Sequence, residues 1–149
     1  MTLPASTRTA LLALHRALVK GERREYEKAH GQVSGGDFLQ ALIRDPAFAW
    51  LAPLTRLIVR LDEHEDAEAE GAEVEAGASV LADIRALLAL TPEGSDFQRR
   101  YAERIDRNPD LAVAHGIALA ELRRAMASRP GVAAEERPAR FKPARELEL

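Results

Sequence analysis

Two histidines are the residues of this sequence best suited to bind a metal ion or a haem. His15 lies in the apolar stripe of a helix predicted over about residues 6–30. His115 lies in the apolar stripe of a second helix, predicted over 108–128. Histidines that face each other inside a helical bundle can ligate haem or a transition metal. A di-iron carboxylate bundle would carry Glu-x-x-His in two helices, whereas this chain has it once, at Glu27. We therefore predict no metal or cofactor and keep a ligand-binding bundle as the alternative.

Three further polar residues accompany these histidines. Glu22 and Tyr26 follow His15 on the same side of the same predicted helix. Tyr101 lies on the apolar side of another predicted helix. A glutamate that is removed from water beside a histidine is a candidate acid–base pair. Buried polar side chains more often bond to Glu, Tyr or backbone partners in the core, so we favour a structural role for both histidines. The candidate ligand-binding set is His15, Glu22, Tyr26, Tyr101 and His115.

Motifs for covalent or phosphate chemistry are absent from the sequence. There is no Gly-x-Ser-x-Gly turn, no glycine-rich phosphate loop and no Walker lysine. The acidic stretch 62–75 lacks the alternating ligands and the glycine of a calcium loop. No residue is therefore assigned a catalytic role, and the sequence favours a protein that is not an enzyme.

Helices must position these side chains, because the chain is rich in alanine, leucine, glutamate and arginine and lacks sustained apolar–polar alternation. The central helix is predicted over 45–65, with Asp45 as the N-cap and Pro46 as the first helical residue. Apolar residues cover most of its circumference, and Pro53 predicts a kink. We expect an all-α helical bundle of four main helices plus one or two short helices, with Trp50 at its centre.

Start and stop signals define the other helices. Ser34 and Ser95 are predicted N-caps with a suitable partner three residues on, and Asn108 caps the last long helix. Gly31 is placed to end the first helix, because glycine tolerates the left-handed conformation found there. A helix over about 73–90 completes the predicted bundle.

The chain is predicted to be one domain with a tail. Its 149 residues fit a single helical-bundle domain, which we place at 1–128. Residues 129–149 form a basic, proline-rich tail that cannot be helical throughout. Eight acidic residues and no lysine or arginine lie between 62 and 75, which predicts a solvated linker. The predicted interaction residues are Trp50, Arg137, Arg140, Phe141 and Lys142.

Composition argues against several classes of protein. The chain has no cysteine, which excludes disulfides and thiolate metal sites. The first apolar run, Leu11–Leu14, is too short for a signal peptide, and no run has membrane-spanning length. We therefore expect a cytoplasmic protein without a membrane partner. The net charge of −3, the few aromatic residues and the lack of a recognition-helix signature argue against nucleic acid.

Two segments resemble parts of small, uncharacterised all-helical bacterial proteins. They are DPAFAWLAPLTRLIVRLDE, from 45 to 63, and YAERIDRNPDLAVAHG, from 101 to 116. The resemblance covers about residues 38–116 and implies an all-helical fold. No activity and no site residue come with it.

The sequence predicts a protein that acts through contacts with another protein, including a second copy of itself. Apolar residues cover more than one face of the central helix, and in a small domain this can leave a patch that needs a partner. One alternative is a bundle that binds a metal, a haem or a small ligand through its inward-facing histidines. Another is a regulatory protein whose basic tail, 129–149, docks on an acidic surface.

Overall fold

The computed structural model describes residues 5–69, 75–91 and 93–128, and the regular secondary structure in these ranges is helical. The α-helices are α1 (Ala5–His30), α2 (Gly35–Arg44), α3 (Ala52–Ala69), α4 (Glu75–Leu87), α5 (Asp96–Arg107) and α6 (Pro109–Ser128). A 3₁₀-helix, η1 (Pro46–Leu51), connects α2 to α3. The predicted all-α class is confirmed for the described residues.

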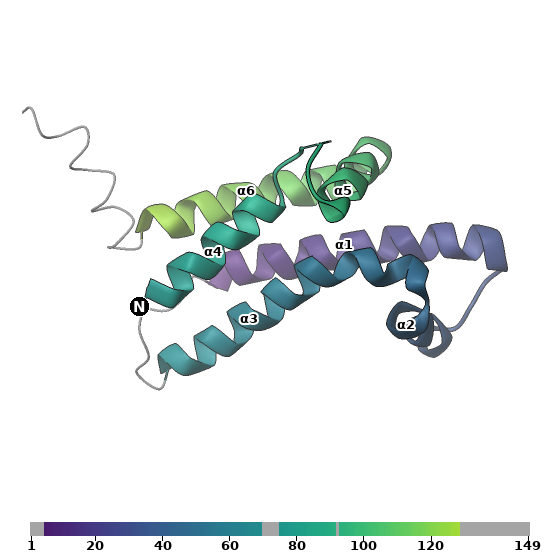
Figure 1. Ribbon diagram of the computed structural model, residues 1–149, viewed down its shortest axis with the longest axis horizontal. Coiled ribbons are helices and arrows are strands. Elements are labelled where there is room, and N and C mark those ends of the chain that lie inside the picture. Colours follow the sequence, from purple (N-terminus) through teal and green to yellow (C-terminus); the bar gives the residue numbers. More distant parts are fainter. Residues whose placement is uncertain (1–4, 70–74, 92, 129–149) are drawn as a thin grey trace, which may run out of the picture.

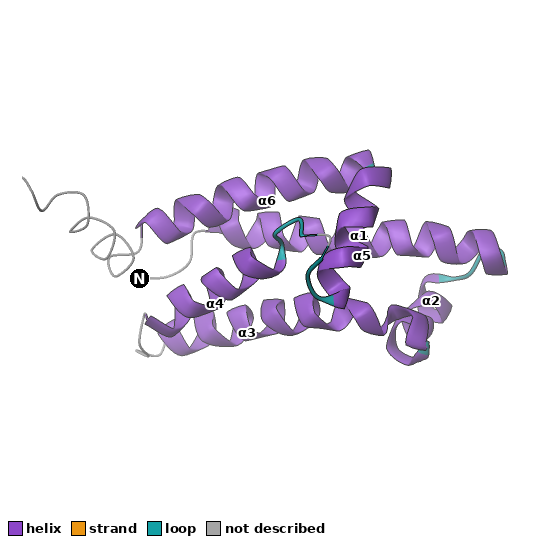
Figure 2. Ribbon diagram, turned by 45° about the horizontal axis from the view of Figure 1, so that its top comes forward, coloured by secondary structure: helices purple, strands orange, loops and turns teal. Residues whose placement is uncertain are grey.

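Four of these helices form the bundle. α1 lies along α6, and the α3–α4 hairpin packs on this pair through contacts of α1 with α3 and of α4 with α6 (Figures 1 and 2). α5 packs on α6 and η1, and α2 packs on η1 near the end of α1 (Figure 1). Each bundle helix contributes a fully buried leucine or isoleucine to the core: Leu14, Leu54, Ile84 and Leu122. The predicted bundle of four main helices is confirmed, and the described residues add two short α-helices, α2 and α5, as predicted, together with the 3₁₀-helix η1.

The predicted helix boundaries are set by local hydrogen bonds. Ser34, Ser95 and Asn108 each accept a hydrogen bond from a backbone amide in the first turn of the helix that follows. Gly31 follows α1 with a φ of 84°, a conformation that side-chain-bearing residues rarely adopt. These four predictions are confirmed, because each depends only on residues within one turn.

The segment predicted as one central helix is two elements. Asp45 caps it as expected, since its carboxylate accepts a hydrogen bond from the amide of Ala47, but the first six residues form η1. At the end of η1, Pro53 has no N–H to donate to the carbonyl of Ala49. The amide of Ala52 donates to that carbonyl instead, in the i→i+3 pattern of a 3₁₀-helix. At the place where a kink was predicted, the structure therefore shows a change from a 3₁₀-helix, η1, to an α-helix, α3.

Most of the acidic stretch is helical, contrary to the linker predicted over 62–75. α3 continues to Ala69 and α4 begins at Glu75. The reason is that alanine and glutamate, which dominate this stretch, have high helix propensities. Residues 70–74 lie outside the described residues, and so does the predicted tail with its interaction residues Arg137, Arg140, Phe141 and Lys142.

Candidate functional site

An ion pair between a buried glutamate and a partly exposed arginine joins α1 to α5. Glu22 is 6% exposed, and its carboxylate accepts hydrogen bonds from Nε of Arg104 at 2.7 Å and from Nη2 at 3.3 Å. The guanidinium carbon of Arg104 also lies 5.0 Å from the ring centroid of Trp50. The forked contact fixes the orientation of the guanidinium, and the aromatic ring attracts its charge. Arg104 therefore ties α1, η1 and α5 together.

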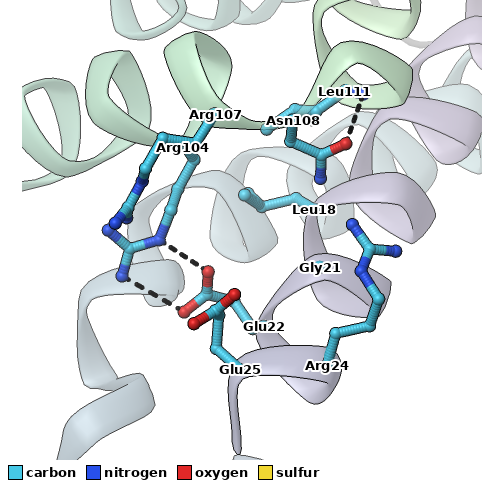
Figure 3. A pocket seen from close by; sticks show the side chains of 9 residues that line it. All are labelled: Leu18, Gly21, Glu22, Arg24, Glu25, Arg104, Arg107, Asn108 and Leu111. Carbon is cyan, nitrogen blue, oxygen red and sulfur yellow. Dashed lines mark hydrogen bonds and ion pairs between the residues drawn. The ribbon is translucent and has the colours of Figure 1, made fainter. Parts of the chain in front are cut away.

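A small cavity lies beside this ion pair, where α1 passes the junction of α5 and α6 (Figure 3). Its volume is about 70 Å³, enough for a few water molecules or a small ion. Gly21 permits the close approach of the helices, because a methyl group there would lie 2.7 Å from Nδ2 of Asn108. The lining residues are Leu18, Gly21, Glu22, Arg24, Glu25, Arg104, Arg107, Asn108 and Leu111.

The charged lining of this cavity is mixed and slightly basic, with three arginines and two glutamates. Figure 3 shows Arg24 on one side and Arg107 on the other, with the carboxylate of Glu25 between them. A hydrogen bond from Lys28 holds the pKa of Glu25 below its ordinary value, and the nearby charges of Lys28, Arg107 and Arg104 act in the same direction. Such a lining suits a small polar or anionic group, which arginines bind through several donors.

Tyr101 and His115 form a second buried polar contact, between α5 and α6. The hydroxyl of Tyr101 lies 2.7 Å from Nδ1 of His115, and the two residues are 0% and 7% exposed. Burial raises the pKa of Tyr101 and lowers the pKa of His115. Both shifts favour the uncharged forms, so the contact is a hydrogen bond between a neutral phenol and a neutral imidazole. This contact is of the structural kind favoured for the histidines from the sequence.

The remaining candidate residues lie apart from this contact. Nε2 of His15 is 3.2 Å from Oγ1 of Thr55 in α3, and burial lowers the pKa of His15. Tyr26 packs in a separate aromatic cluster with α2 and η1. Of the five candidates, the structure joins only Tyr101 and His115 by a hydrogen bond. Within the described residues, no group of three or more His, Asp or Glu side chains could hold a metal ion.

Trp50, predicted as an interaction residue, is 6% exposed and packs mainly within the domain. Part of it lines an open groove of about 440 Å³ between η1–α3 and α4–α5, together with Pro53, Leu87 and Phe97. Its Nε1 is buried without a hydrogen-bond partner among the described residues. Little of the ring is therefore available at the surface, and contact of Trp50 with a partner stays a prediction.

The outward side of α6 exposes large apolar side chains. Val113 is 63% and Ile117 is 53% exposed, one helical turn apart. A methyl group at the adjacent Gly116 would meet nothing within 4 Å. In Figure 2, α6 forms one edge of the bundle, with its outward side away from the other helices. We call the exposed residues Asp110, Val113, Gly116, Ile117 and Arg124, with the half-buried Ala120, the α6 outer face.

The α6 outer face was missed from the sequence, where the apolar residues of 108–128 were assigned to a single inward stripe. The available signal was the pair Val113 and Ile117, which lies outside that stripe at a spacing of four residues. Arg104 was missed as well, because it is one of many charged residues on a strongly amphipathic segment. Only the fold brings Arg104 to Glu22.

Comparison of the chain with protein family models, with curated proteins and with solved structures gave no match. The resemblance of residues 38–116 to small bacterial helical proteins therefore stays a prediction. Among the described helices, none combines the length and the apolar character needed to cross a membrane.

Proposed function

We propose that the protein acts by binding another protein rather than by catalysis, and that the α6 outer face is its contact surface. The exposure of Val113 and Ile117 carries this proposal. Contiguous exposed apolar side chains on a small domain mark interaction sites more often than scattered single ones do. Full burial of a valine or isoleucine side chain is worth roughly 1.5–3 kcal/mol relative to leaving it in water. A partner that covers this face would gain part of that free energy.

A second apolar pair supports the same kind of function. Leu39 and Ile43 on α2 are 54% and 68% exposed and are also four residues apart. The opposite side of α2 is anchored in the domain by Phe38, which is 4% exposed. α2 has ten residues and α6 has twenty, so α2 offers the smaller surface. We therefore assign the principal contact to α6.

The interior favours binding over catalysis because its polar groups are engaged with one another. Glu22 bonds to Arg104, and His115 bonds to Tyr101. Groups that carry out acid–base chemistry need access to a substrate proton. The alternative, a ligand-binding bundle with inward-facing histidines, has less support because His15 contacts α3 whereas His115 contacts α5. The lack of cysteine is compatible with a cytoplasmic location.

Site-specific photocrosslinking in cells that produce the chain tests this proposal. A photoreactive residue at position 117 is expected to form a covalent adduct with a protein, whose mass identifies the partner. Lys28 is the matched control position, because its side chain is 74% exposed at the far end of α1. No adduct from position 117, or an equal yield from position 28, would contradict the proposal.

A further inference from the structure

We propose that the partner of the α6 outer face is a second copy of this chain, with the two α6 helices packed antiparallel about a two-fold axis near Ile117. The inference rests on the function proposed above and names its partner. Asp110, Val113, Ile117, Ala120 and Arg124 follow one another at steps of three and four residues. Residues at this spacing form one seam along a helix. The seam is apolar in its middle and charged at both ends.

The charged ends make this seam complementary to itself. Asp110 precedes Ile117 by seven residues and Arg124 follows it by seven, which is about 10 Å along the helix in each direction. An antiparallel pair centred on Ile117 therefore places Asp110 of each copy level with Arg124 of the other. Arg124 is accessible for this contact, because its side chain is 69% exposed and its ion pair with Glu121 is within the same helix. A parallel pair would instead oppose like charges.

Small residues in and beside the middle of the seam allow close packing of the two helices. Gly116 has no side chain and open space around it, and Ala120 lies one turn further on. The distance between packed helices depends on the side chains at the contact, so small residues there shorten it. Val113 and Ile117 would then be covered by the other copy. A two-fold contact uses the same patch on both copies, so the assembly closes at two chains.

Single cysteines test this geometry directly, because the chain has none of its own. In the Ile117→Cys variant of the full-length protein, oxidation is expected to link two copies across the axis. Lys28→Cys is the control and should give only background dimer. Asp110→Cys and Arg124→Cys should link to each other when mixed. Neither should link to itself, because its two thiols would lie about 20 Å apart along the helices, far beyond disulfide reach.

Charge reversal tests the register independently. Asp110→Arg and Arg124→Asp are each expected to weaken the dimer by about tenfold or more in sedimentation equilibrium, because each opposes two pairs of like charges. The double variant should return to within about threefold of the original, since it restores both pairs with reversed sign. Circular dichroism of each variant checks that the helices remain folded.

Three results would overturn the two-fold dimer: a monomer at millimolar concentration, the cysteine pattern of a parallel pair, or a double variant as weak as the single ones. If the adduct formed in cells at position 117 contains a different protein, the dimer proposal fails and the proposed function stands. If no adduct forms there with any protein, the proposed function fails.

Discussion

Replacement of Glu22 by glutamine is expected to destabilise the domain, although the two side chains have nearly the same shape. The carboxylate accepts hydrogen bonds from Nε and Nη2 of Arg104 at 2.7 and 3.3 Å. An amide offers only one acceptor oxygen and carries no charge, so one of these bonds is lost and the other is weakened. Arg104 keeps its charge, with its side chain 21% exposed and the ring of Trp50 over one face.

The expected magnitude lies between two limits. An exposed ion pair contributes roughly 0.2–1 kcal/mol, whereas removal of one partner from a fully buried pair costs roughly 3–5 kcal/mol. The side chain of Glu22 is 7% exposed, which is close to the buried limit, while Arg104 still reaches water. We therefore expect a loss of about 2 kcal/mol in the free energy of unfolding. For a domain of this size, that loss lowers Tm by about 4–8 °C.

Urea and thermal unfolding of Glu22→Gln measure this loss, with Arg60→Ala as the matched control. Arg60 pairs with Asp83 between α3 and α4 at 3.2 Å, but these side chains are 48% and 51% exposed. Its removal should therefore cost less than about 1 kcal/mol. A double-mutant cycle of Glu22 with Arg104 should give a coupling energy of at least about 1 kcal/mol. A cost for Glu22→Gln no larger than that of the control would refute the reasoning.

Two further predictions concern the buried tyrosine and histidines. Tyr101→Phe removes the hydroxyl that is hydrogen-bonded to Nδ1 of His115 at 2.7 Å and should lower the free energy of unfolding by about 1–2 kcal/mol in urea. An unchanged value would contradict the structural role of this contact. Burial lowers the pKa of His15 and of His115 below the ordinary 6.5. At a pH between the lowered pKa of the folded state and 6.5, the unfolded chain therefore binds more protons than the folded one. The free energy of unfolding should therefore fall as the pH decreases below about 6.5, and it should fall less steeply in His115→Gln. Urea titrations at several pH values measure this. The same pH dependence in His115→Gln and in the original protein would count against burial as the cause.

Much of the fold could be predicted because it depends on short-range chemistry. The caps at Ser34, Ser95 and Asn108 each accept a hydrogen bond from the amide three residues further on, and Gly31 acts through its own backbone. A disturbance near Pro53 was predicted, and the structure shows the change from η1 to α3 there. Pro53 has no N–H to donate to the carbonyl of Ala49, and the amide of Ala52 donates to that carbonyl instead, in the 3₁₀ pattern.

The candidate site could be predicted only in part, because its contacts join distant segments. Glu22 was recognised as a polar residue on the inward side of its predicted helix. Its partner Arg104 lies 82 positions away in the sequence, among many other arginines. The two inward histidines were recognised too, yet the structure bonds His15 to Thr55 and His115 to Tyr101. A sequence shows which side of a helix can be buried and does not show which helix buries it.

The sequence by itself determined the helical class, the start of most helices and the apolar residues available to the core. These follow from propensity, capping and periodicity, which operate within a few residues. Only the tertiary structure decided the Glu22–Arg104 ion pair and the cavity beside it. It also decided that Val113 and Ile117 face outward, because α6 is apolar on more than one side and the packing of α1, α4 and α5 selects which side is covered.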